Sequence, residues 1–144
     1  MPFQIKQYIF ISLVVSIWIN ASEVFRYFVF VMPRVKSFFV GKAGVAEMDW
    51  IIFSIWGFWD SLLTALLVFL FWLYARSFGN NWRSIFVSGS IAWLFVFVIF
   101  WVATANMGLA EWSILWITLP LSWIEMVVGT AIAAHLYRQK VAFS

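Results

Sequence analysis

The sequence predicts an all-α integral membrane protein, a bundle of four transmembrane helices in up-down-up-down order. Hydrophobic residues make up 65% of the 144 residues and charged residues only 10%, whereas soluble domains have about 45–50% apolar and about 25% charged residues. The chain contains four apolar runs, each long enough to meet the need of about 20 residues for a helix that crosses the hydrocarbon core. Short connections separate most of the runs, so consecutive helices should be antiparallel neighbours.

The predicted helices belong to one membrane domain, residues 1–144, and cover residues 8–32, 50–74, 85–105 and 112–136. Each run must be helical, because the bilayer core has no water to satisfy backbone N–H and C=O groups. The first helix is expected to end before Pro33, since proline lacks an N–H donor and clashes with the preceding turn. Residues rich in glycine and asparagine form turns before the third and fourth helices, at 79–81 and 106–108.

The distribution of basic residues predicts that both termini are cytoplasmic. Five Lys and Arg residues lie at the end of the bundle that holds the termini and the second connection, and three lie at the other end. Cytoplasmic loops carry an excess of Lys and Arg, which favours this orientation. The sequence has no basic stripe of the kind that binds nucleic acid, so no nucleic-acid partner is expected. The predicted partners are the lipid bilayer and either a second copy of the chain or another membrane protein.

Polar and small residues gather on one face of three predicted helices. On a helical wheel with 100° per residue, they span roughly 120° in the first helix and roughly 80° in the fourth. These faces should therefore point away from lipid. Their members are Ser12, Ser16, Asn20, Glu23, Arg26 and Tyr27 in the first helix, Ser54, Gly57, Asp60, Ser61 and Thr64 in the second, and Thr118, Ser122, Glu125, Gly129 and Ala133 in the fourth.

Three acids and one base on these faces lie at neighbouring depths. At a rise of 1.5 Å per residue, Glu23, Asp60 and Glu125 are roughly 14, 15 and 20 Å from the outer ends of their helices. Three ionised carboxylates beside the single cation Arg26 would carry a severe desolvation and repulsion penalty. We therefore expect that one carboxyl group holds a proton or that a cation lies among them. Arg26 should pair with one or two acids, and Glu23 is within its reach on the same helix.

This acid-rich site predicts proton- or cation-linked transport or conduction of a small solute, because proton relays and cation pathways use such carboxylates near the midplane. Glu23, Asp60 and Glu125 would exchange the proton or hold the ion. Arg26 would keep one acid ionised or meet an anionic group. The residues expected to support the site are Asn20, Ser61, Thr64, Ser122, Trp59 and Trp123.

The same residues are compatible with two other functions. The polar cluster can be a structural part of a non-catalytic accessory or assembly subunit, since polar side chains also join membrane helices, at about 0.6 kcal/mol each. Alternatively, the acids can act as general acid and base in an enzyme or carrier for a lipid-soluble molecule. Trp59 and Trp123 would then form an aromatic wall for an organic cation or a flat ligand, although tryptophans also serve as ordinary packing residues.

Several kinds of chemistry are excluded by the residues that the sequence lacks. Cysteine is absent, and the single histidine, His135, rules out haem held by two histidines and di-iron sites held by histidine clusters. The lysines lie near the ends of the apolar runs, which excludes a Schiff base inside the bundle. Without a phosphate loop, a nucleophile–base pair or metal-ligand spacing, we predict no metal site and no cofactor, and an enzyme is the less favoured class.

Small residues four positions apart recur in the last two predicted helices. Ser88 and Ala92 form one such pair, and Gly129 and Ala133 form another. Small residues at this spacing let helix backbones approach closely. They fit either close packing within the bundle or a face that forms a homodimer.

Overall fold

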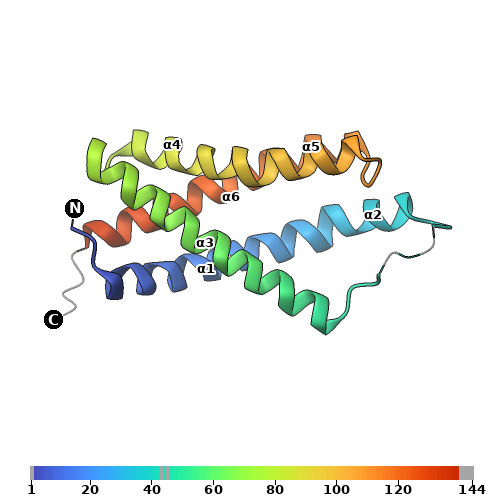
Figure 1. The fold of residues 1–144 in the computed structure, drawn as a ribbon, viewed down its shortest axis with the longest axis horizontal. Helices are drawn as coiled ribbons and strands as arrows, with labels where there is room; N and C mark the ends of the chain where they lie inside the picture. The colour runs from blue at the N-terminus through green and yellow to red at the C-terminus, as the bar shows by residue number, and fades with distance from the viewer. Residues whose placement is uncertain (1, 43, 45, 140–144) are drawn as a thin grey trace.

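A computed structural model of the protein describes residues 2–42, 44 and 46–139. Within these residues, four helices are long and apolar enough to cross a membrane, at Ile5–Phe38, Trp50–Phe78, Trp82–Asn106 and Trp112–Arg138. Figure 1 shows them running back and forth along one long axis, with both ends of the chain on the same side. The predicted all-α fold, with four spans in up-down-up-down order, is confirmed.

The first span is longer than predicted and contains a π-helical segment. It consists of α1 (Ile5–Arg26), η1 (Tyr27–Val31) and α2 (Met32–Phe38). The expected end before Pro33 is wrong, because Pro33 lies in the first turn of α2 and the helix continues beyond it. The backbone N–H of Met32 donates to the carbonyl of Tyr27, five residues earlier. We attribute the continuation to this wider turn, which gives the proline ring room beside the preceding carbonyls.

The other three spans agree with the prediction to within a few residues. α3 (Trp50–Phe78) starts after Asp49, whose side chain accepts the backbone N–H of Ile52 at 2.8 Å. α4 (Trp82–Trp93) is capped in the same way by Asn81. It continues through a second π segment, η2 (Leu94–Val98), into α5 (Ile99–Asn106). α6 (Trp112–Arg138) completes the bundle.

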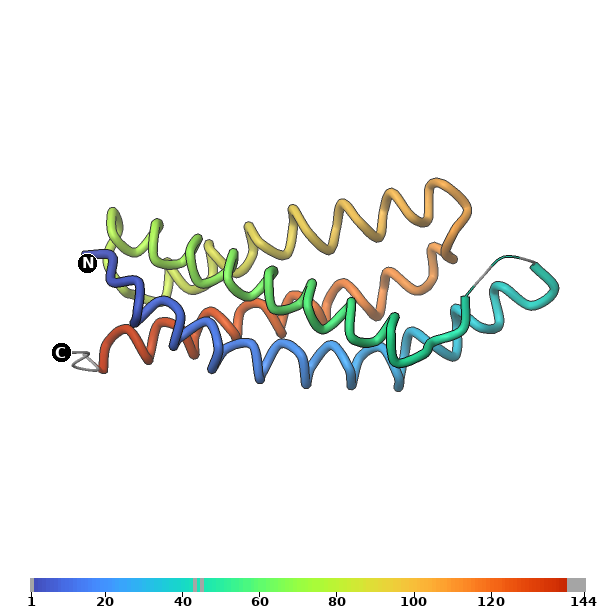
Figure 2. The backbone as a smooth tube through the Cα atoms, turned by 60° about the horizontal axis from the view of Figure 1, so that its bottom comes forward, coloured from blue at the N-terminus to red at the C-terminus, as the bar shows by residue number. Residues whose placement is uncertain are grey.

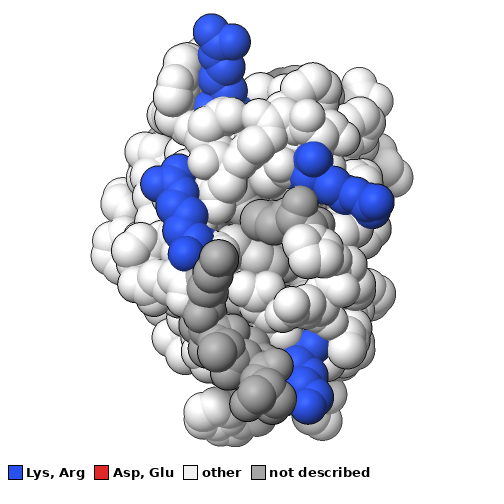
Figure 3. All heavy atoms as spheres, turned by 90° about the vertical axis from the view of Figure 1, so that its left-hand side faces the viewer, with Lys and Arg blue, Asp and Glu red and all other residues white. Residues whose placement is uncertain are grey.

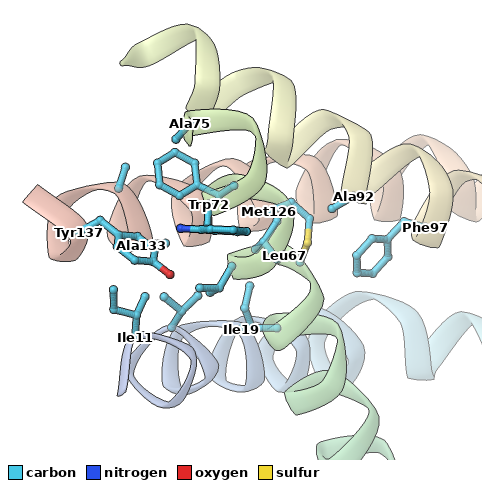
Figure 4. Packing of buried hydrophobic residues seen from close by; sticks show 14 residues of the cluster. Ile11, Ile19, Leu67, Trp72, Ala75, Ala92, Phe97, Met126, Ala133 and Tyr137 are labelled. Carbon is cyan, nitrogen blue, oxygen red and sulfur yellow. The ribbon is translucent and has the colours of Figure 1, made fainter. Parts of the chain in front are cut away.

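The main hydrophobic core joins all four spans, but α3 contributes to it only with its second half. Figure 4 shows Ile11 and Ile19 of α1 facing Leu67 and Trp72 of α3, with Met126 of α6 beside them. The buried residues of α3 begin at Thr64 and end at Ala75. A smaller cluster, between η1, α5 and α6, lies near the other end of the bundle and contains Val31, Ala105, Ala110, Ile114 and Leu115. The part of α3 before Leu63 therefore lies outside both clusters.

The paired small residues lie inside the bundle. A Cβ atom at Gly129 of α6 would lie 3.0 Å from Ile19 Cδ1 and 3.3 Å from Leu67 Cδ2, and Ser88, Ala92 and Ala133 are buried. Next to Ser88, Gly89 approaches the backbone of α6 so closely that a Cβ atom there would lie 3.1 Å from Val127 Cα. Of the two alternatives for these residues, the structure favours packing within the bundle. A homodimer stays a prediction.

The two ends of the bundle differ in charge. Figure 3 looks at the end that holds both termini, where the charged side chains in view are Lys and Arg, with no Asp or Glu among the described residues. The exposed acids Glu47, Asp49 and Glu111 all belong to the connections and helix starts at the opposite end. The cytoplasmic location of the termini stays a prediction, which depends on the excess of Lys and Arg.

Replacing Gly89 with alanine should destabilise the bundle, because the new Cβ would overlap the backbone of α6. The expected loss is about 1–3 kcal/mol, the usual cost of overpacking, measured by unfolding in detergent. Gly57→Ala is the matched control, since a Cβ there meets only Asn20 Oδ1, at 3.5 Å. Both changes gain similar helix propensity. Equal stability of the two variants would contradict the close approach of α4 and α6.

Candidate functional site

Arg26, the last residue of α1, is at the centre of a buried polar cluster. Its side chain is inside the bundle, and the residue is only 4% exposed. Nη2 forms an ion pair with Glu23, one turn earlier on α1, and Nη1 donates a hydrogen bond to Oγ1 of Thr118 on α6. Nε lies 3.8 Å from Oε2 of Glu125 on α6. The guanidinium also lies over the ring of Phe97 in η2, 5.1 Å from its centroid. Arg26 thus connects α1 with α6 and η2.

Glu125 is 1% exposed, and its carboxyl group is only partly satisfied. Oε2 accepts a hydrogen bond of 2.8 Å from Ser22 Oγ on α1. Oε1 has no donor among the described residues, while the carboxyl group of Glu23 lies within hydrogen-bonding reach of Glu125. Two carboxyl groups can form a hydrogen bond with each other only when one of them carries a proton. A bond of 3.1 Å from Trp18 Nε1 to the backbone carbonyl of Glu125 further joins α1 to α6.

Asp60 of α3 lies apart from these bonds. The charges of Glu23 and Arg26 both act on it, yet its carboxylate makes no hydrogen bond or ion pair within the part of the chain that the structure describes. Its backbone carbonyl accepts a hydrogen bond of 2.7 Å from Thr64 Oγ1. Among the described residues, no three Asp, Glu or His side chains come together in a group that could hold a metal ion. The acids therefore form a Glu23–Glu125 pair and a separate Asp60.

A groove of about 1280 Å³ opens beside these residues, and its lining includes Glu23, Arg26 and Asp60. It lies between the first half of α3 on one side and η2 and α5 on the other. α3 packs against α1, α4 and α6, but over the described residues it has no comparable packing against η2 or α5. Figures 1 and 2 both show α3 diverging from α5 toward the end of the bundle away from the termini. The groove therefore has no wall on the side where these helices separate.

The walls of the groove are apolar and largely aromatic. Trp56 and Trp59 line it from α3, and Phe95 and Phe100 line it from η2 and α5. All four are exposed, between 49% and 65%, so in a membrane they face lipid as well as the groove. The lining extends to residues of the two connections at the far end of the bundle, such as Met48 and Leu109. An apolar passage thus leads from the lipid to the charged residues.

Some of the predicted site residues form the charged cluster around Arg26 or line the groove, and the others make separate contacts. Glu23, Arg26 and Glu125 are in contact with one another, and Asp60 shares the groove with the first two. Asn20 and Trp59 also line the groove. Thr64 is fully buried one turn after Asp60, and its Oγ1 donates a hydrogen bond to the Asp60 backbone carbonyl.

The remaining three predicted residues make other contacts. Ser61 donates to the Gly57 carbonyl and lies 3.2 Å from the Ser16 hydroxyl. Ser122 donates to the Leu119 carbonyl on its own helix at 3.0 Å. Trp123 donates to Ser90 Oγ on α4, also at 3.0 Å. These side chains join or stabilise helices and do not line the groove.

Some residues of the cluster were not predicted as part of the site. Ser22 and Trp18 donate hydrogen bonds to Glu125. Ser22 precedes Arg26 by four residues and so lies about 40° from it on the helical wheel. Its position on the polar face of the first helix could therefore have been predicted. Phe97 offers no such signal, because it comes from a different span. The π segments were also missed, although their sequences, Tyr-Phe-Val-Phe-Val and Leu-Phe-Val-Phe-Val, resemble each other closely.

The polar residues of the site thus come from α1, α3 and α6, and its aromatic walls come from α3, η2 and α5. No protein-family model, curated protein or solved structure matches the chain.

Replacing Arg26 with glutamine should destabilise the protein strongly, because Glu23 and Glu125 would lose their buried counter-charge. Removing one partner of a buried ion pair costs about 3–5 kcal/mol, measured as the free energy of unfolding in detergent. Arg34→Gln is the control, since Arg34 is exposed on α2 and, within the described chain, its side chain bonds only the Phe30 carbonyl. The double variant Arg26→Gln/Glu125→Gln should recover part of the loss. Simple addition of the two single losses would contradict the pairing of Arg26 with Glu125.

Proposed function

We propose that the protein carries out proton-linked transport of a small solute across the membrane. The observation that carries this proposal is the excess of acids over bases beside one groove: Glu23 and Glu125 pair with the single base Arg26, and Asp60 lines the same groove as Arg26 and Glu23. Ionisable residues inside a membrane span are costly, and they usually mark proton relays or ion pathways. A cation could in principle take the place of the proton, and two features of the site favour the proton.

The first feature is that the carboxyl groups of Glu23 and Glu125 share the single cation Arg26. Oε1 of Glu125 is buried without a donor among the described residues, and the carboxyl groups of Glu23 and Glu125 both lie against the Arg26 guanidinium. A proton held between the two groups would satisfy both, as in other carboxyl pairs that share one proton. The second feature is that no three Asp, Glu or His side chains meet there among the described residues, whereas a hard metal cation usually takes several oxygen ligands, carboxylates among them.

Arg26 would couple the uptake and release of the proton to the packing of α1 against α6. While the proton is held, Arg26 balances the charge of Glu23, with which it is paired. When the proton leaves, the charge of Glu125 is added, and its Oε2 already lies 3.8 Å from Arg26 Nε. Loss of the proton should therefore draw Arg26 and Glu125 together, and uptake should release them. Because these residues lie on α1 and α6, the exchange would act on the packing of two helices.

Asp60 has a different role in this proposal, because it lines the groove and its carboxylate has no hydrogen bond or ion pair among the described residues. It would contact the solute, while the Glu23–Glu125 pair holds the proton. With both termini in the cytoplasm, as the Lys and Arg distribution favours, the groove would open in the outer half of the bilayer.

A second candidate function is that of an accessory subunit whose polar cluster only fixes the positions of its helices. The observation that favours it is the number of bonds between α1 and α6: Ser22, Trp18 and Arg26 all contact α6. Such bonds also occur where polar side chains merely join membrane helices. In this case the cluster would contribute to stability and assembly without moving a proton.

Glu125→Gln should abolish proton movement, because glutamine keeps the shape of glutamate but cannot exchange a proton. The measurement is the acidification of liposomes that contain the reconstituted protein and a pH-sensitive dye, after a proton gradient is imposed. Glu111→Gln is the matched control, since Glu111 is exposed at the start of α6 and its side chain bonds only Ser113 among the described residues. It should retain the wild-type rate.

Two outcomes would support the accessory subunit instead. Wild-type liposomes would acidify no faster than protein-free liposomes, and Glu125→Gln would lower the unfolding temperature in detergent.

An infrared band of a protonated carboxyl group provides a second test of the proton. It should be present in the wild type and in Glu111→Gln and missing in Glu125→Gln. The presence of this band in all three proteins would contradict the role of the Glu23–Glu125 pair.

A further inference from the structure

We infer that the groove binds a lipid-soluble organic cation, which enters sideways from the bilayer and whose charge is met by Asp60. This inference rests on the proposed transport function and names the substrate class of the same site. Three properties of the groove carry it: the charge that remains in its lining, the aromatic composition of its walls and the side on which it is open.

The charge of the lining favours a cation. Arg26, Glu23 and Asp60 are the charged residues that line the groove among those described. Arg26 is buried, bonded to Glu23 and Thr118 and covered by the Phe97 ring, and its Nε faces Glu125 Oε2 at 3.8 Å, so two carboxyl groups already balance its charge. Asp60 is not paired with any cation among the described residues. An unpaired carboxylate in apolar surroundings is costly, and a cationic ligand would remove this cost.

The walls of the groove suit a cation with an aromatic or otherwise bulky apolar body. Trp59 directly precedes Asp60, Trp56 lies one turn earlier, and Phe95 and Phe100 line the opposite wall. Aromatic faces attract an organic cation within about 6 Å, and tryptophan does so best. The volume of about 1280 Å³ exceeds the range of about 300–1,000 Å³ for common ligand pockets. A small hydrophilic cation would leave most of this apolar surface uncovered.

The open side of the groove sets the route of entry. The buried residues of α3 begin only at Thr64, and the earlier part of the helix is not packed against α5 in the described chain. Leu62 and Leu66 on α3 and Ile99 on α5 line the groove and are also exposed to the surroundings. In a membrane, a molecule that passes between these residues comes from the acyl chains. The ligand must therefore dissolve in lipid.

Charge complementarity also separates this ligand from other occupants of the groove. An apolar helix from a second copy, or a neutral lipid, could cover the aromatic walls but would leave the Asp60 carboxylate unpaired. An anionic lipid would add a second negative charge beside it, and like charges in contact disfavour binding. A lipid-soluble cation would both cover the apolar walls and balance the charge of the Asp60 carboxylate.

Tetraphenylphosphonium and tetraphenylborate test the inference directly, because they share one shape and carry opposite charges. Their binding to the protein in lipid nanodiscs is measured by equilibrium dialysis, with empty nanodiscs as the blank. The cation should bind saturably, and the anion should show only the partition into lipid. Asp60→Asn should weaken binding of the cation by about tenfold or more, which corresponds to a loss of at least about 1.4 kcal/mol of binding free energy.

Asp49→Asn is the matched control for Asp60→Asn. Asp49 caps α3 outside the groove, and asparagine caps helices as well as aspartate does, so binding should remain at the wild-type level. Equal weakening in both variants, undiminished binding in Asp60→Asn, or equal saturable binding of the two ions would each overturn the inference.

A second measurement does not depend on the folding of Asp60→Asn. The protein has no cysteine, so Phe100→Cys in the groove wall and Phe58→Cys on α3 outside the lining can each be labelled alone with a membrane-permeant maleimide. Tetraphenylphosphonium should slow labelling at position 100 and leave position 58 unchanged. Slow labelling at position 100 before any cation is added would indicate a lipid or a second copy in the groove and would overturn the inference.

The failure of this inference can be told from the failure of the proposed function. Proton movement through the wild type without saturable binding of tetraphenylphosphonium would contradict the cation as the substrate class and leave the transport proposal standing. Saturable binding that depends on Asp60, without proton movement, would contradict the transport proposal and leave the groove as a binding site for lipid-soluble cations.

Discussion

The buried charge of Arg26 is the constraint on which the rest of the structure depends. An arginine near the middle of a membrane helix costs about 2.5–3.5 kcal/mol on insertion scales unless partners surround it. The partners of Arg26 come from three elements: Glu23 from α1, Thr118 and Glu125 from α6, and Phe97 from η2. Their side chains reach Arg26 only if α1, α6 and η2 meet at its depth. One charge thus determines how three of the elements are arranged.

The π segments belong to the same arrangement. η1 begins directly after Arg26, and η2 contains Phe97, which covers its guanidinium. A π turn widens the helix and changes the direction of the side chains around it, and such turns are frequent at functional sites. In η1 the wider turn has a second consequence, because the helix continues past Pro33. Two irregular turns therefore flank the one arginine inside the bundle.

The groove exists because the first half of α3 takes no part in this arrangement. Its second half enters the main core, while its first half packs chiefly along α1 and leaves the space toward α5 uncovered. In water, such an apolar surface would be driven to close. In a bilayer it is not, because lipid chains are as apolar as the side chains that would replace them. An open, aromatic groove is therefore stable in lipid, and the Asp60 carboxylate can lie at its side without a hydrogen bond or ion pair from the described protein.

The sequence by itself determined the class of fold, the four spans and the polar faces. Lipid offers no partner for backbone groups, so length and hydropathy suffice to locate membrane helices. Helical periodicity likewise puts Glu23 beside Arg26, three residues apart on α1, and depth puts Glu125 at a neighbouring level. Only the tertiary structure decided that Glu125, and not Asp60, shares Arg26.

The reason is that a helical wheel tells which residues share a face, but not which faces meet or how the helices tilt. Trp123 illustrates the limit: it precedes Glu125 by two residues, which turns it about 200° around the helix, toward Ser90 on α4. The divergence of α3 from α5, and with it the groove, likewise follows from helix tilt. Tilt depends on how whole side chains pack, a property that no single helix encodes.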